Sequence, residues 1–155
     1  MSLIAVSVDV ATTTALGRFD MKTIELTGVA LDWAVAKCMT GGELFQSGRI
    51  ARAVVLHSVG GTVAPYFVKD SGMMCCAFEP STDWAQGGPI IERIKGFLFK
   101  HWLEMKRESH QCQAEIHNYD GDWIAFGPTP LIAALRCFVA SRLGDNVAIP
   151  ADLLI

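Results

Sequence analysis

A polar segment in the middle of the chain combines residue types that bind anions. Between residues 81 and 89 it offers two hydroxyls, a carboxylate, an indole and an amide. Its two glycines let backbone N–H groups approach a ligand closely, and a helix start just beyond it favours negative charge. The segment therefore predicts a pocket for a small anionic or nucleotide-like molecule, with an indole as a stacking wall. The predicted ligand-binding residues here are Ser81, Thr82, Asp83, Trp84, Gln86, Gly87 and Gly88.

A second interpretation of this segment is purely structural. Its polar groups would then fix a turn and cap a helix that starts at Pro89. Proline suits the first helical position, because an N–H there has no partner within the helix. The segment contains neither GxxxxGK[ST] nor GxGxxG, the spacings that diagnose a phosphate-binding loop. Both interpretations therefore stay open at the level of sequence.

Two further residues complete the predicted ligand set. Thr129 precedes another helix, and Arg136 lies about two turns into it. An anion bound near Thr129 would reach Arg136 only if a second element changed the geometry of this region. The favoured alternative to a binding role is that Thr129 is an N-cap and Arg136 a surface arginine.

The histidines and cysteines predict no metal site and no cofactor. His110, Cys112 and His117 would have to join Cys75 or Cys76, yet Cys112 and His117 fall on opposite faces of an expected strand. No C-x-x-C or H-x-x-x-H pair is present. Any pairing of the five cysteines and four histidines into a nucleophile and its base would be arbitrary.

The carboxylates near the polar segment predict no catalysis. Asp83 and Glu92 would have to converge on a substrate with shifted pKa values to act as an acid–base pair, and ordinary solvation is the better expectation. We therefore expect a protein that is not an enzyme.

Composition limits the remaining classes. A chain of 155 residues with 51% hydrophobic content is typical of a single domain. The net charge of −3, with no basic run longer than Lys106 and Arg107, disfavours a nucleic-acid partner. An odd number of cysteines indicates a reducing compartment, and neither a signal peptide nor a membrane span is apparent, so we expect a cytoplasmic protein.

The elements expected around these residues define an α+β fold: one compact domain with a small antiparallel sheet of hairpins packed against two to three helices. Alternating residues predict a strand over 3–10, and helical spacing predicts a helix over about 28–39, with Thr27 as its N-cap and Gly41 and Gly42 closing it. Residues 53–59 and 62–68 flank a Gly-Gly turn as a hairpin, and Pro65 places its second strand at an edge.

The second half of the chain carries the clearest signals. A helix from Pro89 continues at helical spacing to Leu98, although Phe97, Phe99 and Leu103 could equally alternate as a strand. Residues 112–117 and 123–126 form a hairpin around Asp120 and Gly121. The last helix starts at Pro130 behind the N-cap Thr129 and stops at Gly144.

Three blocks of this sequence resemble one family. The blocks 21–38, 81–93 and 127–145 are similar, in order and in wording, to the NinX proteins of tailed phages and prophages. The resemblance extends from Met21 to about the carboxyl terminus, as a NinX-like domain over 21–155. Residues 1–20 lie outside it as an N-terminal extension or an extra strand. The resemblance implies a phage origin and a life in the bacterial host cytosol, and it carries no established activity.

Together these observations predict a phage accessory protein that acts by binding. The first hypothesis is capture of a small anionic or nucleotide-derived host molecule, which would suit counter-defence or host modulation. The alternative is a protein–protein interaction module that binds a host or phage partner, or a second copy as a homodimer, because four tryptophans suit an interface core.

Overall fold

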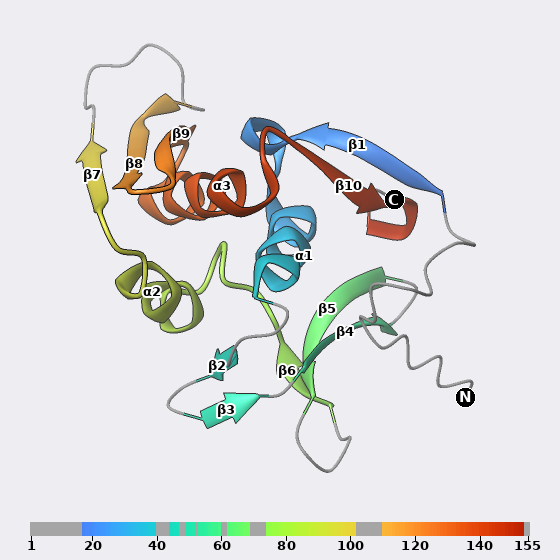
Figure 1. Ribbon diagram of the computed structural model, residues 1–155. Helices are drawn as coiled ribbons and strands as arrows, with labels where there is room; N and C mark the ends of the chain where they lie inside the picture. Colours follow the sequence, from blue (N-terminus) through green and yellow to red (C-terminus); the bar gives the residue numbers. More distant parts are fainter. Residues whose placement is uncertain are drawn as a thin grey trace.

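The computed structural model describes residues 17–39, 44–46, 49–51, 53–59, 62–68, 74–101 and 110–153. Helices and small antiparallel sheets alternate along these residues, which confirms the predicted compact α+β class (Figure 1). The elements are β1 (Arg18–Lys22), η1 (Thr23–Glu25), α1 (Gly28–Cys38), β2 (Leu44–Gln46), β3 (Arg49–Ala51), β4 (Ala53–Val59), β5 (Thr62–Val68), β6 (Met74–Ala77), α2 (Trp84–Glu92), β7 (Phe97–His101), β8 (Cys112–Asn118), β9 (Gly121–Gly127), α3 (Pro130–Leu143), β10 (Asn146–Pro150) and η3 (Ala151–Leu153).

The described strands form four antiparallel sheets. Two have two strands, β1–β10 and β2–β3, and two have three strands, in the orders β4–β5–β6 and β7–β8–β9. No described helix is long and apolar enough to span a membrane.

The helix α3 lies at the centre of the fold. It contacts β8 and β9 along one side and α1 and α2 elsewhere (Figure 1). Toward the sheet it presents Ala133, Ala134 and Cys137, which pack with the inner face of β8. The approach is so close that a Cβ on Gly127 would come within 2.6 Å of the Ala133 backbone nitrogen. Small side chains on α3 therefore set how near the helix lies to the sheet.

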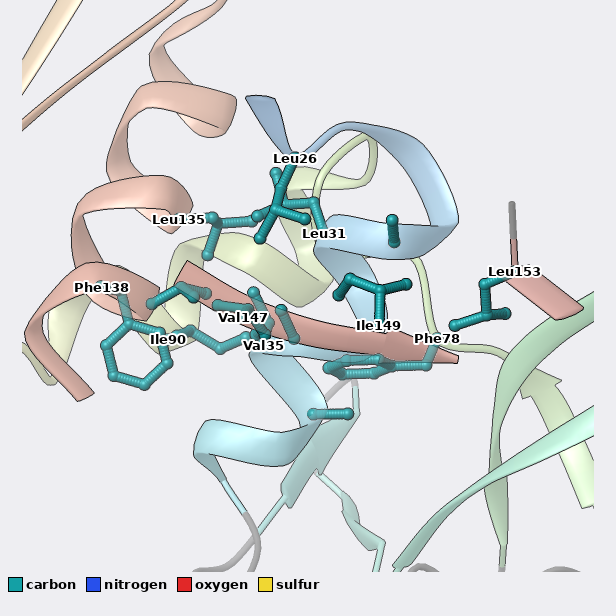
Figure 2. Packing of buried hydrophobic residues seen from close by; sticks show 14 of the residues in the cluster. Leu26, Leu31, Val35, Phe78, Ile90, Leu135, Phe138, Val147, Ile149 and Leu153 are labelled. Atoms are coloured by element: carbon teal, nitrogen blue, oxygen red, sulfur yellow. The ribbon is translucent and has the colours of Figure 1, made fainter. Parts of the chain in front are cut away.

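The main hydrophobic core forms on the other sides of α3. Figure 2 shows side chains of α1, α3 and β10 packed together, with Phe78 beside Ile149 at one side of the cluster. Leu31 and Val35 of α1 and Leu135 of α3 are fully buried there. Because α3 contributes to both clusters, its side chains are buried on nearly every side of the helix. The buried surface of α3 is therefore wider than the one apolar face expected from helical spacing.

The predicted boundaries of α3 are confirmed. The Thr129 hydroxyl oxygen accepts a hydrogen bond from the Ile132 N–H at 3.2 Å, and Pro130 occupies the first helical position. Gly144 ends the helix with a φ of 86°, a left-handed conformation that glycine adopts without strain.

The helix predicted over 28–39 is also confirmed, as α1. Thr27 is its N-cap, although its side chain makes no capping hydrogen bond. Gly41 and Gly42, expected to close it, lie outside the described residues, as does the strand predicted over 3–10.

The first predicted hairpin is present, but the position of its second strand was predicted wrongly. β4 and β5 pair from Ala53 with Val68 to Val59 with Thr62. Pro65 does not place β5 at an edge, because β5 lies between β4 and β6. The short β6 pairs with β5 only from Tyr66 onward, so Pro65 lies beyond that ladder, and its carbonyl accepts the Phe78 N–H at 2.8 Å. The missing donor of Pro65 therefore interrupts no bond to β6.

The second predicted hairpin is confirmed, and the ambiguous stretch before it is resolved. β8 and β9 pair up to Asn118 and Gly121, which leaves Tyr119 and Asp120 as the turn. α2 ends at Glu92, and Phe97 to His101 form β7, so this stretch changes from helix to strand.

The start of α2 corrects the prediction for Pro89. The helix begins at Trp84, because Asp83 caps it by accepting the Ala85 N–H at 2.9 Å, and Pro89 lies inside it. The expected exposed loop therefore ends at Asp83. Pro89 lacks the N–H that would reach the carbonyl of Ala85, and Ala85 is exposed, so water can satisfy that acceptor.

The pairing of the two ends of the described chain has no counterpart among the predicted elements. β1 and β10 pair antiparallel from Arg18 with Pro150 to Lys22 with Asn146. The boundary proposed at Met21 falls inside β1, so residues 18–20 of the proposed extension or extra strand belong to a sheet.

The two glycines of α2 offer a matched test of this packing. A Cβ at Gly87 would come within 2.5 Å of both a Leu131 methyl group and the Pro80 carbonyl oxygen, whereas at Gly88 the nearest atom, on Trp84, is 3.9 Å away. We expect Gly87→Ala to lower the free energy of unfolding by about 1–3 kcal/mol. Gly88→Ala should leave it unchanged or raise it by up to about 1 kcal/mol. Urea denaturation of both variants measures this, and equal effects would contradict the packing described.

Candidate functional site

The residues predicted as an anion pocket divide between the interior and the surface. Ser81 is buried, and its N–H donates to the Asp32 carboxylate at 2.8 Å. Gln86 is buried as well: its side chain donates to the Ala77 carbonyl at 3.1 Å and accepts the Glu79 N–H at 2.9 Å. The Ser81 backbone N–H and the Gln86 side chain therefore link the turn before α2 to its neighbours.

The other residues of the segment occupy the exposed start of α2. The Thr82 hydroxyl is 3.5 Å from the Glu79 carbonyl oxygen, Asp83 caps the helix, and Trp84 is 57% exposed. Gly87 packs against α3. None of the seven residues lines either of the two cavities described below.

Thr129 and Arg136 also have separate environments. Thr129 is an exposed N-cap. Arg136 is only 4% exposed, so the expectation of a surface arginine is wrong. Its guanidinium donates from Nε to the Leu26 carbonyl at 2.9 Å and from Nη1 to the Phe126 carbonyl at 2.8 Å. It thus links the segment before α1 to β9, a contact between distant segments that helical spacing alone does not reveal.

Asp32 in α1 has a buried carboxyl group and is not among the candidate residues predicted from the sequence. Burial raises its pKa from 3.8 to about 7; the Ser81 N–H offsets part of this effect, and the Glu79 carboxylate adds to it. Asp32 sits among the buried positions Ala30, Leu31 and Ala34 of the helix. A carboxylate inside an apolar stripe is the signal that would have marked it.

A cleft of about 520 Å³ is lined by described residues from three helices and a hairpin. It lies where the carboxyl ends of α1, α2 and α3 meet the β8–β9 turn. Its apolar lining comes from Ile90, Ile94, Ile116, Phe138 and Trp123.

The charged residues that line the cleft are mostly basic. Arg93, Lys95 and Arg142 face a single carboxylate, Asp120. Arg142 also lies over the Phe138 ring, 5.8 Å from its centroid, so part of its stem covers the apolar lining. The C-terminal end of a helix carries a partial negative charge, and each of these three cations is at or just past the end of α2 or α3. The cations therefore first balance the helix ends, and a modest positive excess remains.

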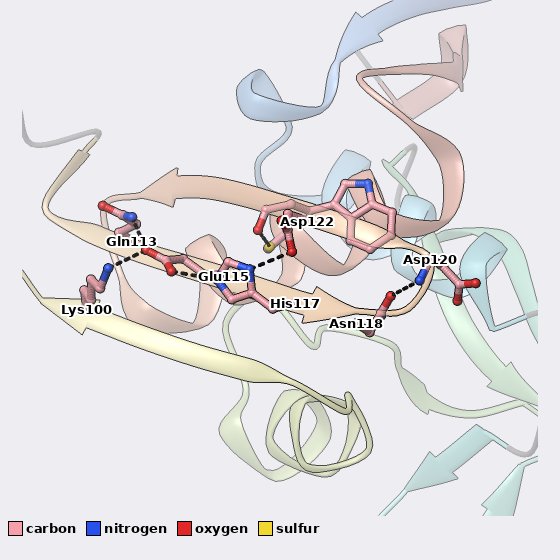
Figure 3. Close-up of polar contacts among 9 residues, drawn as sticks. Lys100, Gln113, Glu115, His117, Asn118, Asp120 and Asp122 are labelled. Atoms are coloured by element: carbon pink, nitrogen blue, oxygen red, sulfur yellow. Dashed lines mark hydrogen bonds and ion pairs between the residues drawn. The ribbon is translucent and has the colours of Figure 1, made fainter.

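A chain of charged groups crosses the outer face of the β7–β8–β9 sheet. Figure 3 shows Glu115 held between the Lys100 ammonium, at 2.7 Å, and the His117 imidazole, at 2.9 Å. The other ring nitrogen of His117 lies 2.8 Å from the Asp122 carboxylate. The hydrogen bonds from Lys100 and then His117 hold the pKa of Glu115 at about 2. The hydrogen bonds to Glu115 and then Asp122 raise the pKa of His117.

This network is separate from Cys112, one of the thiols considered for a metal site. Cys112 is buried on the inner face of β8, whereas His117 is exposed on the outer face, as the strand pattern predicts. Among the described residues, no group of three His, Cys, Asp or Glu side chains is placed to hold a metal ion.

The buried Asp32 makes stability depend on pH. Because its folded-state pKa lies above the unfolded value, its stabilising contribution is complete below pH 3.8 and is lost as the pH rises through about 7. The loss from this group amounts to roughly 4 kcal/mol. We expect Asp32→Asn, which keeps an oxygen acceptor for the Ser81 N–H, to flatten the unfolding free energy between pH 4 and pH 8. Urea denaturation across this range, with the exposed Asp20→Asn as control, measures it, and an unchanged slope in Asp32→Asn would contradict the assignment.

The pKa of His117 reports on the network directly. Removing the Asp122 charge takes away one of its two anionic partners, so we expect Asp122→Asn to lower the pKa of His117. Titration of the imidazole proton by NMR measures the shift, and Asp120→Asn in the adjacent turn is the control. A pKa that stays the same in Asp122→Asn would show that the ion pair does not form in solution.

The sequence was compared with known proteins. The family described as bacteriophage P22, NinX matches residues 22–142, which include α1, α2, the whole β7–β8–β9 sheet and all of α3 but its last residue. No curated protein matches the chain. The match covers more than half of the chain and agrees with the resemblance carried by its three sequence blocks. The chain therefore belongs to the NinX family of phage accessory proteins.

Proposed function

We propose that this NinX-family protein binds a small anionic, nucleotide-like molecule of the host cell in the cleft at the ends of α2 and α3, and that it does so without chemical conversion. The observation that carries the proposal is the lining of the cleft: apolar and aromatic side chains on its walls and three cations against one carboxylate. This combination suits a ligand with a flat ring and a phosphate.

The size of the cleft supports a ligand of this class. A volume of about 520 Å³ lies within the range of roughly 300–1,000 Å³ typical of small-molecule sites. Trp123 and Tyr119 supply aromatic surface on β9 and on the turn, and Asn118 supplies an amide that can both donate and accept hydrogen bonds. A base can stack on such rings and present its edge to the amide.

The charges support an anion at one end. Arg93 and Lys95 follow α2, and Arg142 is in the last turn of α3, so the cations approach the cleft from two helices. Guanidinium groups donate paired hydrogen bonds to phosphate oxygens, and these bonds are stronger than neutral ones. Because the helix ends offset part of the positive charge, binding rests on these short contacts more than on the net field.

The cleft is better suited to this role than the segment 81–89, from which the anion-binding hypothesis arose. The backbone N–H of Ser81 and the side chain of Gln86 are engaged in structural contacts, whereas the cleft has space and cations together. The segment still contributes indirectly, because Asp83 starts the helix whose far end lines the cleft.

The lining of the cleft gives no support to catalysis. Of its described residues, Asp120 is the single carboxylate, and the Ser141 hydroxyl donates to the Phe138 carbonyl at 2.7 Å. We therefore propose stoichiometric capture, which fits an accessory protein acting on the host cytosol by removing or buffering a metabolite.

The alternative of a protein-interaction module has weaker support. Leu98 and Ile124 are both more than half exposed on the outer face of the β7–β8–β9 sheet. In the strand register Glu115 lies between Leu98 and Ile124, so a charged side chain interrupts the apolar surface. Scattered exposed apolar residues of this kind are normal on a protein surface.

Calorimetric titration with nucleoside monophosphates tests the proposal, with the corresponding nucleosides as ligands that lack the anion. We expect a monophosphate to bind at least tenfold more tightly than its nucleoside, as the loss of one charge-assisted hydrogen bond would produce (about 1.5–3 kcal/mol). Lys95→Gln should weaken binding of the monophosphate without changing the melting temperature, because Lys95 is exposed.

The matched control is Lys22→Gln, an equally simple loss of an exposed cation that lies outside the cleft. Absence of binding for all monophosphates at millimolar concentration, or equal weakening in the two variants, would refute the assignment of this cleft.

A further inference from the structure

A second cavity, of about 290 Å³, is lined by residues from η1, β9, α3 and the start of β10. It shares no lining residue with the larger cleft. Its lining includes the buried Arg136, the exposed Lys22 and two isoleucines, Ile24 and Ile124. A buried cation beside apolar side chains is an uncommon combination, and it suggests what this cavity holds.

Arg136 carries a charge that its described neighbours do not neutralise. Its two hydrogen bonds go to the carbonyl oxygens of Leu26 and Phe126, which are neutral. Among the described ion pairs none involves Arg136, although the guanidinium has five N–H donors. Burial without a counter-ion disfavours the charged form and lowers the pKa of Arg136. An oxyanion in the cavity would supply the missing partner.

The charges around the cavity favour a single carboxylate. Lys22 and Arg136 stand against one acidic residue, Asp145, which leaves an excess of one positive charge. The hydroxyl of Thr23 is already committed to the Gly144 carbonyl at 2.6 Å. A planar carboxylate matches the planar donor edge of a guanidinium.

The apolar lining selects what the carboxylate is attached to. Ile24 is 43% exposed and Ile124 is 55% exposed, yet both line the same cavity. Exposed branched side chains at a cavity mouth gain hydrophobic free energy when an aliphatic group covers them. The ligand that satisfies both parts of the cavity has an aliphatic group close to its carboxylate.

We propose that this second cavity binds a small carboxylate that carries a branched aliphatic side chain. The carboxylate contacts Arg136 and lies within the field of Lys22, and the aliphatic group covers Ile24 and Ile124. This site is independent of the nucleotide-like ligand proposed for the larger cleft.

The probe for this proposal is N-acetyl-L-leucine, with N-acetyl-L-leucinamide as the matched compound that lacks the charge. Titration followed by amide NMR shifts should show millimolar or tighter binding of the acid, with shifts at β9 and η1. Binding of the amide should be at least tenfold weaker, because a neutral amide cannot replace the charged acceptor (about 1.5–3 kcal/mol).

Two pairs of variants separate the contributions without disturbing Arg136, whose removal would also break the link between Leu26 and Phe126. Ile124→Thr should weaken binding of the acid severalfold, whereas Leu98→Thr, which changes a side chain of nearly equal exposure on the same sheet, should not. Lys22→Gln should weaken it, whereas Lys95→Gln in the larger cleft should not. The proposal is overturned if the acid causes no shifts, if the amide binds as tightly, or if the two members of either pair behave alike.

Discussion

The side of α3 that faces the β7–β8–β9 sheet carries small residues, and the close approach that they permit determines much of the rest of the structure. Ala133, Ala134 and Cys137 bring the helix against β8, and Gly127 comes so near that no side chain would fit there. With this side fixed, the opposite sides of α3 face α1, α2 and β10 and complete the main core. The far end of α3 then meets the β8–β9 turn, and this meeting creates the cleft. The cleft is thus a consequence of packing that begins two helical turns away.

Buried polar groups fix how the elements join around α3. Arg136 holds the segment before α1 and the end of β9 at one side of the helix. Asp32 holds the turn before α2 against α1 through the Ser81 N–H. Each of these contacts joins segments that are far apart in the sequence, and each is worth more inside a protein than in water because no solvent competes. They specify the arrangement of three helices that hydrophobic packing alone would leave less well defined.

The features that could be predicted from the sequence are those with local signals. Thr129, Pro130 and Gly144 mark both ends of α3, and the alternation on either side of Asp120 marks the β8–β9 hairpin. The start of α2 could not be predicted, because two glycines weaken its intrinsic helix propensity. The tight contact with Leu131 explains the glycine at position 87.

Other features depend on contacts over long sequence separations. They are the pairing of β1 with β10, the burial of Arg136, and the position of Arg93 and Arg142 at one cleft. Such contacts leave no periodic trace. The proposal of an anionic ligand came from the sequence, whereas the place proposed for it came from the structure.

The meeting of three helix carboxyl ends at the cleft has a consequence for the speed of encounter. The partial negative charges of the helix ends cancel much of the field of Arg93, Lys95 and Arg142 at distances beyond a few ångströms. An approaching anion would feel little attraction until it enters the cleft, so its association rate should stay well below the roughly 10⁸–10⁹ M⁻¹s⁻¹ of electrostatically steered partners and should change little with ionic strength. A site of this kind discriminates between ligands by their dissociation rates. Polyanions such as nucleic acids, which are attracted by long-range positive fields, would not be drawn to it.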